Sequence, residues 1–269
     1  MAILKEEGRQ RDFSARAPLP CPSLALGAAR VDAELRGGLK RDGLHELYAV
    51  RPEDDASALG FALALSRRRQ EAGGRPLFWA RLSRGAVPYG PGLVDLGLAP
   101  RHLALALLPD ERALLRAGLD AVRAGAASVV LLEVQGACPL LDLTASRRLT
   151  LAAAETGTMV LLARSGATPA PSAAHSRWHV AAAPSCGLAC APDGEAPGAP
   201  AFALTLLRHR GGRNELRCML EWDRDRVLFQ ERALFQERED APALAPWPVP
   251  WDETQVARPR AANDRGGGW

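Results

Sequence analysis

Short apolar runs and amphipathic segments alternate through the chain between residues 43 and 164. The apolar runs, such as SVVLLEV, are nearly continuous, which is typical of strands that are buried on both faces. The segments between them repeat apolar residues at helical spacing. This alternation predicts an α/β fold with a mostly parallel central sheet and helices on both faces. The predicted strands cover 43–50, 76–81, 128–134 and 158–164, and the predicted helices cover 55–72, 110–125 and 143–157.

The pattern changes after Arg164. Three further segments, 176–185, 201–210 and 214–222, have strand character with no helix between them. A loop rich in Gly and Pro, CAPDGEAPGAP, joins the first two, and RHRGGRNE has the residues of a hairpin turn. We therefore expect the sheet to end in an antiparallel extension.

Both ends of the chain lack apolar periodicity. Residues 1–25 alternate charges with prolines and are predicted to form an N-terminal arm, so the core domain is expected to span 26–237. Residues 238–269 are rich in Pro, Gly and charge, which predicts a disordered C-terminal tail. The tail still carries three tryptophans, which we interpret as candidate contacts with a partner: Trp247, Trp251 and Trp269.

Composition adds a broad class to this picture. Of the 269 residues, 47% are hydrophobic and 24% are charged, an ordinary balance for a soluble protein. Apolar runs such as FALAL fall far short of the ~20 residues that span a bilayer. The N-terminus is polar and lacks the apolar region of a signal peptide. We expect a cytoplasmic protein with no membrane contact.

The cysteines give little sign of a metal site. They are odd in number and none forms a CxxC pair, so a reducing compartment would leave them as thiols. Cys186 and Cys190 could instead share a metal, but no second Cys or His pair follows at ligand spacing. The interpretation as thiols is favoured, and no metal or other cofactor is expected. The five positions are Cys21, Cys138, Cys186, Cys190 and Cys218.

A net charge of +3 is too small to indicate a nucleic-acid-binding protein by itself. Arginines do cluster at 67–69, at 147–148 and within RHRGGR at 208–213. We interpret each cluster alone as a solvated helix end or strand edge.

The segment AVRPEDDASALG follows the first strand and enters a helix, in the order of a phosphate-binding loop, but it contains no GK[ST]. Such a loop needs a lysine for the terminal phosphates and a hydroxyl for magnesium. Here Arg51 is the candidate cation, and Glu53, Asp54 and Asp55 stand where phosphate would approach. Their carboxylates would stabilise the helix dipole and repel a triphosphate. The sequence predicts a degenerate nucleotide loop that is occupied by its own side chains.

Several short motifs resemble a known family. GGLKRDGLHELYAV is similar to the first core strand of RecA recombinases, and residues 89–133 resemble the RecA stretch that leads to the third core strand. The motifs GLHEL, PLFWAR, YGPGLVDLGL, SRRLTLAAAETG, PSAAHSRWHV and LEW, in this order, resemble the ImuA family more closely. These are RecA-like accessory proteins of bacterial damage-induced mutagenesis. The resemblance implies a RecA-like core.

The RecA machinery is incomplete in this chain. The lysine and the Ser/Thr of the phosphate loop have no counterpart between Ala49 and Gly60. Glu133 resembles the magnesium-side acid, but the interpretation as an ordinary strand-end carboxylate is favoured. The water-activating glutamate falls near Arg81, and the glutamine that reports nucleotide state falls near Ala163. Because hydrolysis needs the cradle, the metal and the water-positioning group together, the resemblance implies no catalysis.

The resemblance also bears on partners. The two DNA-binding loops of RecA correspond to 134–148 and 165–176, which contain no aromatic residue to stack on bases, so DNA contact is expected to be weak or indirect. Arg208 and Arg210 resemble the paired basic residues that RecA extends toward the nucleotide of its neighbour. The alternative is an exposed strand edge with two guanidinium groups.

The function implied by the family is that of a non-catalytic adaptor in SOS translesion synthesis. Its implied partners are ImuB, which is an inactive relative of Y-family polymerases, an error-prone polymerase subunit reached through ImuB, and RecA. One alternative is a SulA-like division inhibitor that binds FtsZ, against which stand the length of the chain and its Trp-bearing tail. The other alternative is an ATPase with an unorthodox loop.

Overall fold

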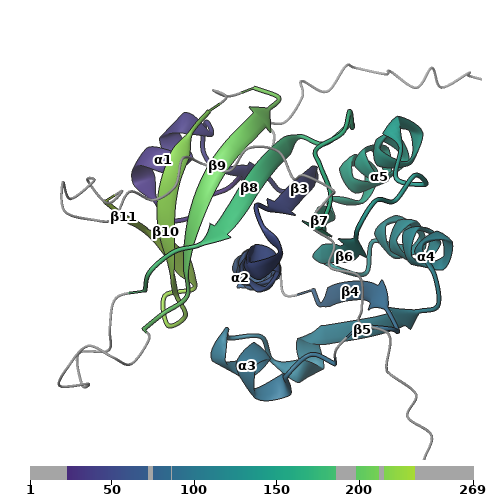
Figure 1. Ribbon diagram of the computed structural model, residues 1–269, viewed down its shortest axis with the longest axis horizontal. Coiled ribbons are helices and arrows are strands. Elements are labelled where there is room, and N and C mark those ends of the chain that lie inside the picture. The colour runs from purple at the N-terminus through teal and green to yellow at the C-terminus, as the bar shows by residue number, and fades with distance from the viewer. Residues whose placement is uncertain (1–22, 72–74, 86, 186–197, 212–214, 234–269) are drawn as a thin grey trace, which may run out of the picture. The chain divides into compact units, whose positions relative to one another are not determined.

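The computed structural model describes residues 23–71, 75–85, 87–185, 198–211 and 215–233. The described residues form a nine-stranded sheet in the order β11-β10-β9-β8-β3-β7-β6-β4-β5, and β1 pairs separately with β2 (Figure 1). The strands are β1 (Ser23–Leu24), β2 (Leu39–Lys40), β3 (Leu44–Ala49), β4 (Leu77–Leu82), β5 (Leu103–Leu108), β6 (Val129–Gln135), β7 (Met159–Ser165), β8 (Ser176–Ala182), β9 (Ala201–His209), β10 (Arg217–Asp223) and β11 (Leu228–Arg232).

The sheet has a parallel part and an antiparallel part, as predicted. Strands β5, β4, β6, β7, β3 and β8 run parallel to one another. Strands β9, β10 and β11 continue the sheet with antiparallel pairing. Three parallel connections pass through a long helix: α2 (Asp55–Glu71) after β3, α4 (Glu111–Ala124) after β5, and α5 (Leu143–Thr156) after β6. The predicted α/β class with its antiparallel extension is confirmed.

Alternate residues of the central strands face two separate cores. Leu131 of β6 and Leu161 of β7 face the core that contains α2, whereas Val130 and Leu132 face the core under α4 and α5. All four side chains are fully buried. Because both faces of these strands are covered by helices, no position can be polar without a partner, which explains the continuous apolar runs of the sequence.

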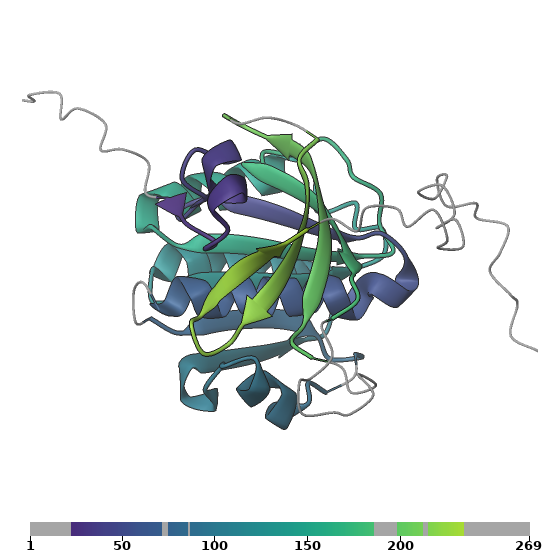
Figure 2. The same ribbon diagram turned by 90° about the vertical axis from the view of Figure 1, so that its left-hand side faces the viewer.

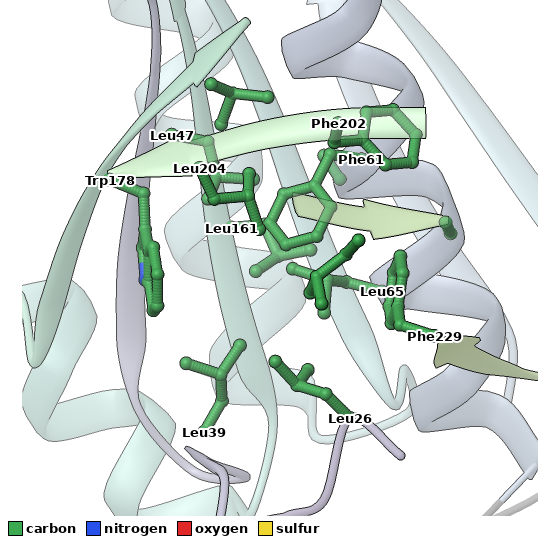
Figure 3. Packing of buried hydrophobic residues seen from close by; sticks show 14 of the residues in the cluster. Leu26, Leu39, Leu47, Phe61, Leu65, Leu161, Trp178, Phe202, Leu204 and Phe229 are labelled. Atoms are coloured by element: carbon green, nitrogen blue, oxygen red, sulfur yellow. The ribbon is translucent and has the colours of Figure 1, made fainter. Parts of the chain in front are cut away.

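The twisted sheet curves around α2, which therefore packs against the parallel strands on one side and the antiparallel extension on the other (Figures 1 and 2). Phe61 of α2 lies 5.4 Å, ring centre to ring centre, from Phe202 of β9 and 5.3 Å from Phe229 of β11. Trp178 and Leu65 extend the same cluster (Figure 3). A helix enclosed on both sides needs apolar residues around most of its circumference, which accounts for the FALAL run.

Helices α4 and α5 begin and end at residues that satisfy their free backbone groups. The Oδ1 atoms of Asp110 and Asp142 accept hydrogen bonds from the amides of Ala113 and Ala145, at 2.8 and 2.7 Å. Glycines in the left-handed region follow both last turns, Gly125 at φ 63° and Gly157 at φ 71°. Since the strand before each helix ends at the carboxyl edge of the sheet, both helix C-termini lie at the amino edge.

The structure contains elements that the sequence pattern did not predict. Helix α1 (Ala29–Glu34) follows β1, α3 (Gly90–Asp95) follows β4, and β5 and β11 form the two edges of the sheet. Edge strand β5 was not predicted, although its run LALALL is as apolar as those of the other parallel strands; Leu105 and Leu107 are exposed. Strand β1 starts at Ser23, so the last residues of the predicted arm belong to the fold. Residues 1–22 and the predicted tail lie outside the described residues.

Two further features bear on the predicted class. Among the described residues, no helix is both long enough and apolar enough to cross a membrane. The same part of the chain contains no group of three or more His, Cys, Asp or Glu side chains that could hold a metal ion. Cys138 and Cys218 are free thiols, whereas Cys21, Cys186 and Cys190 lie outside the described residues.

Candidate functional site

The carboxyl ends of the parallel strands meet the first turn of α2, at the edge of the sheet where ligands bind in open α/β folds. Strand β3 leads into the one-turn 3-10 helix Pro52–Asp54 and then directly into α2. Alternation along β4 and β6 turns Trp79, Arg81 and Glu133 toward the α2 face, because Leu77 and Leu131 at the same parity belong to that core. We call this group, together with the loop after β3, the carboxyl-edge site.

The loop after β3 is held by the chain's own side chains. The Nε atom of Arg51 lies 3.3 Å from Oε1 of Glu53 and 3.3 Å from Oδ2 of Asp54. Asp54 is 1% exposed, and its Oδ1 accepts a hydrogen bond from the amide of Ala182, at 2.9 Å. The carboxylate of Asp54 therefore also connects the loop to the end of β8, a contact that the sequence does not indicate. The candidate cation Arg51 already faces two carboxylates.

Asp55 places a third carboxylate at the first position of α2. Burial raises the pKa of Asp55, a hydrogen bond with the Ser165 side chain of β7 opposes this shift, and the charge of Asp54 adds to it. In the part of the chain that the structure describes, Oδ1 of Asp55 is buried without a hydrogen-bond partner. A carboxylate in this position complements the helix dipole and repels an anion, in agreement with the interpretation of the loop as degenerate.

Arg81 and Glu133 form an ion pair across neighbouring strands. Nη2 of Arg81 lies 3.2 Å from Oε1 of Glu133, and the indole Nε1 of Trp79 donates to Oε2 of Glu133, also at 3.2 Å. The side chains of the pair are only 8% and 10% exposed. The guanidinium carbon of Arg81 also lies 5.5 Å from the centre of the Trp79 ring. Glu133 is thus enclosed by a cation and an indole, and its two oxygens are both engaged.

Glu133 is buried, with only 8% of its surface exposed to solvent. Burial raises the pKa of its carboxyl group above the ordinary value, and the positive charge of Arg81 and the hydrogen bond from Trp79 only partly oppose this effect. Gly85 leaves the space that the arginine needs, because a Cβ atom at this position would lie 2.5 Å from Nη2 of Arg81. The cation that neutralises Glu133 is therefore the side chain of Arg81. The two residues form one ion pair.

The loops that correspond to the RecA DNA-binding loops are short and fixed by arginines. Residues 143–148 belong to α5, so the first loop covers only 136–142. Nη2 of Arg164 donates to the carbonyl of Gly136 at 3.2 Å. Nη2 of Arg177 donates to Oγ of Ser172, 2.9 Å away, while its Nε bonds Glu46 at 2.7 Å.

The other predicted site residues lie apart from this edge. Ala163 is buried in the α2 core and offers no polar group to a nucleotide. Arg208 and Arg210 are exposed near the end of antiparallel β9, which lies at the amino edge of the sheet, opposite the loop. Their role as contacts remains a prediction. Trp247, Trp251 and Trp269 lie outside the described residues.

The sequence indicated the charged members of the site, but neither Trp79 nor the ion pair of Arg81 and Glu133. The register pairs Trp79 with Leu131 and Ala80 with Leu132, and its continuation brings Arg81 beside Glu133. This register pairs segments that are about 50 residues apart in the sequence. The alternation of residues within either strand therefore does not indicate that Arg81 and Glu133 are neighbours. Chemically, the carboxyl-edge site offers several carboxylates and two arginines that are already paired, a poor set for binding a nucleotide triphosphate.

Comparison with known proteins adds the family. No family model matches the chain. The protein named ImuA from Caulobacter vibrioides, strain NA1000 / CB15N, is 31% identical over 207 residues, which cover 72% of this chain and 81% of that protein. ImuA from strain ATCC 19089 / CIP 103742 / CB 15 matches to the same extent. The chain belongs to the ImuA family. It is therefore grouped with the accessory proteins of DNA damage-induced mutagenesis, as the sequence motifs implied.

The fold of this ImuA-family chain is also similar to a solved recombinase. The crystal structure of the RadB recombinase matches it with a TM-score of 0.52 and 13% sequence identity, covering 78% of this chain and 100% of that one. At this identity the likeness shows the fold alone, and it confirms the RecA-like core.

Proposed function

We propose that this ImuA-family chain is a non-catalytic RecA-like adaptor of SOS translesion synthesis in the cytoplasm. In this role it binds ImuB, reaches an error-prone polymerase subunit through ImuB, and contacts RecA. The observation that carries the proposal is the ion pair of Arg81 and Glu133, together with the pairing of Arg51 to Glu53 and Asp54.

Phosphoryl transfer requires positive charge around the transferred phosphate. A metal ion and several cations must neutralise the charge that develops on the transferred phosphate. At the carboxyl-edge site the acid that would face a metal is neutralised by Arg81, and Asp54 and Asp55 bring further negative charge to the helix start. Recruiting Glu133 for a metal would leave Arg81 buried without its partner, which costs several kcal/mol. A well-packed RecA-like fold without this chemistry favours a role in binding other proteins.

Nucleotide binding provides the first test. Thermal unfolding of the full chain should be unchanged by millimolar ATP with magnesium, and equally unchanged by ADP. A ligand present at 100 times its Kd would add about 2.7 kcal/mol to the free energy of unfolding. A nucleotide-dependent increase in Tm that is lost in an Arg51→Ala variant would place a nucleotide at the loop and contradict the proposal.

Partner binding provides the second test. Calorimetric titration of the full chain with ImuB should show binding with the same Kd in the presence and absence of ATP and magnesium. No measurable binding to ImuB would contradict the adaptor role. A tenfold change of Kd on addition of ATP, about 1.4 kcal/mol, would instead indicate a nucleotide-gated protein.

A further inference from the structure

The amino edge of the sheet, opposite the carboxyl-edge site, carries a row of cationic side chains. Strand order places them one after another from β9 to β5, since each belongs to a strand start, a strand end or a helix end at this edge. We call them the amino-edge row: Arg36, Lys40, Arg41, Arg69, Arg75, Arg101, Arg123 and Arg210.

Contacts link the members at the β9 end. The amide of Arg210 donates to the carbonyl of His175, at 2.9 Å. A Cβ atom at Gly43 would meet the side chains of both Lys40 and His175, so these two lie side by side over the glycine. Burial lowers the pKa of His175 to about 4; the charges of His209, Lys40 and Arg210 add to this shift, and Asp42 opposes it.

The other end of the row is built on helix C-termini. Nη2 of Arg69 donates to the carbonyl of Gly157 after α5, at 3.1 Å, and Nη1 of Arg75 donates to the carbonyl of Gly125 after α4, at 2.5 Å. Arg123 lies on the last turn of α4, and Arg101 precedes β5 in the 3-10 helix Pro100–His102. The prediction that Arg69 is a solvated helix end is wrong, because Arg69 is only 5% exposed.

Helix capping explains part of this charge but not all of it. Arg69 and Arg75 complement the partial negative charges of two helix ends. Arg36, Arg101, Arg123 and Arg210 are exposed, and no side-chain hydrogen bond or ion pair is found for them within the described residues. Four carboxylates are nearby: Asp42 pairs with Lys40 at 3.3 Å, Glu71 at the end of α2 pairs with Arg67 at 2.7 Å, and Glu34 and Glu155 lie on the last turns of α1 and α5.

The row also contains like charges at close quarters in a buried setting. Burial, and then the charges of Arg41 and Arg75, lower the pKa of Arg69 to about 10. Its Nε atom is buried and has no hydrogen-bond partner among the described residues. Such crowding is unfavourable in the free protein, and a bound polyanion would reduce it. At the carboxyl edge, by contrast, Arg51 and Arg81 each pair with a carboxylate.

We propose that the amino-edge row binds the phosphate backbone of duplex DNA. From β9 to β5 there are six inter-strand spacings of about 4.8 Å, so the row measures roughly 29 Å along the curved edge of the sheet, at most the length of about nine base pairs. A single strand fits less well, because proteins that bind single strands stack bases on aromatic rings. Among the exposed large apolar side chains of the described residues, the aromatic one is Tyr89, which follows β4 at the other edge. The contact is sequence-independent, since the row offers charge without base-reading side chains.

This inference goes beyond the proposed adaptor function and can be tested without any partner protein. Fluorescence anisotropy with a labelled 30-base-pair duplex would be measured for the full chain between 50 and 200 mM salt. We expect binding that weakens with salt. The double variant Arg101→Glu/Arg123→Glu should bind about tenfold or more weakly, and its slope of log K against log salt should be smaller by about 0.9 for each lost contact.

The matched control is Arg112→Glu/Arg147→Glu. It changes the net charge by the same amount on exposed positions near the starts of α4 and α5, away from the amino edge, and it should bind as the unmodified chain does. The far end of the row is tested by Arg36→Glu/Arg210→Glu, which should weaken binding in the same way. Circular dichroism of every variant shows whether it has folded.

Three results would overturn the proposal. The first is no binding of the duplex at 50 mM salt. The second is an equal loss of affinity in the control variant, which would mean that net charge alone attracts DNA. The third is tighter binding of a 30-nucleotide single strand than of the duplex, which would remove the assignment to duplex DNA. Loss of ImuB binding, in contrast, would bear on the adaptor role alone.

Discussion

The guanidinium of Arg81 and the carboxylate of Glu133 form an ion pair at 3.2 Å between adjacent parallel strands, with both side chains nearly buried. Arg81 stands where RecA has its water-activating glutamate, and Glu133 stands where RecA has its magnesium-side acid. Together they are a neutral pair that takes part in the packing of the sheet against α2. The ion pair gives the Glu133 carboxylate a structural role, which supports the interpretation as an ordinary strand-end carboxylate.

The first prediction concerns the stability of this pair. Glu133→Gln leaves a buried guanidinium without its counter-charge and should lower the free energy of unfolding by about 3 kcal/mol. Arg81→Met should cost less, because the Glu133 carboxyl, whose pKa is already raised, can take up a proton. The double variant should be close to the unmodified chain, so a double-mutant cycle in urea should give a coupling above about 1 kcal/mol.

A surface pair serves as the control for that cycle. Arg84 and Glu111 are 2.7 Å apart but more exposed, and Arg84→Met/Glu111→Gln should change stability by about 1 kcal/mol or less. If both single variants of the buried pair stay within about 0.5 kcal/mol of the unmodified chain, the pair does not stabilise the fold.

The second prediction concerns acid. His45 is fully buried between Oγ of Ser176 and the carbonyl of Lys40, and burial lowers its pKa to about 3. Because the unfolded chain binds this proton near pH 6.5, the stability held by neutral His45 is complete above that pH and is lost as the pH falls toward 3. The loss should be about 2 kcal/mol at pH 5.

Urea unfolding between pH 8 and pH 5 would measure this effect. His45→Gln should make the pH dependence shallower, while His102→Gln, at an exposed histidine, should leave it unchanged. An identical slope in the unmodified chain and in His45→Gln would show that another group is responsible.

The third prediction concerns RecA. Arg208 and Arg210 are exposed near the end of β9, where they can reach acidic or phosphate groups of a neighbouring protein. Charge-assisted contacts contribute about 1.5 to 3 kcal/mol each, so Arg208→Ala/Arg210→Ala should weaken binding to ATP-loaded RecA by about tenfold or more. Arg147→Ala/Arg148→Ala, at exposed positions of α5, is the matched control in the same titration. Undiminished binding by the folded β9 variant would exclude these arginines from the contact.

The fourth prediction concerns the C-terminal tryptophans. Removing residues 239–269 should weaken ImuB binding about tenfold or more in a calorimetric titration, because aromatic anchors carry a large share of interface energy. Trp247→Ala/Trp251→Ala in the full chain should reproduce most of the loss. Arg258→Ala/Arg260→Ala, in the same segment, should not. Unchanged affinity after the deletion would place the ImuB contact within residues 1–238.

The sequence alone determined the α/β class, the antiparallel extension, the loss of the phosphate-binding loop and the family. Each of these depends on local information. The apolar run of a strand such as 128–134 and the helical spacing of apolar residues in 110–125 lie within short continuous segments. The absence of GK[ST] is likewise seen directly in the loop sequence.

Tertiary structure decided how the charged residues are used. Asp54 accepts a hydrogen bond from the end of β8, Arg81 neutralises Glu133, and Arg69 is buried against the end of α5. The same register gathers scattered arginines into the amino-edge row. The physical reason is that a charged side chain has the same local pattern whether it faces solvent or a partner. Strand order and register between segments tens of residues apart determine its partner. The local periodicity of the sequence indicates neither of them.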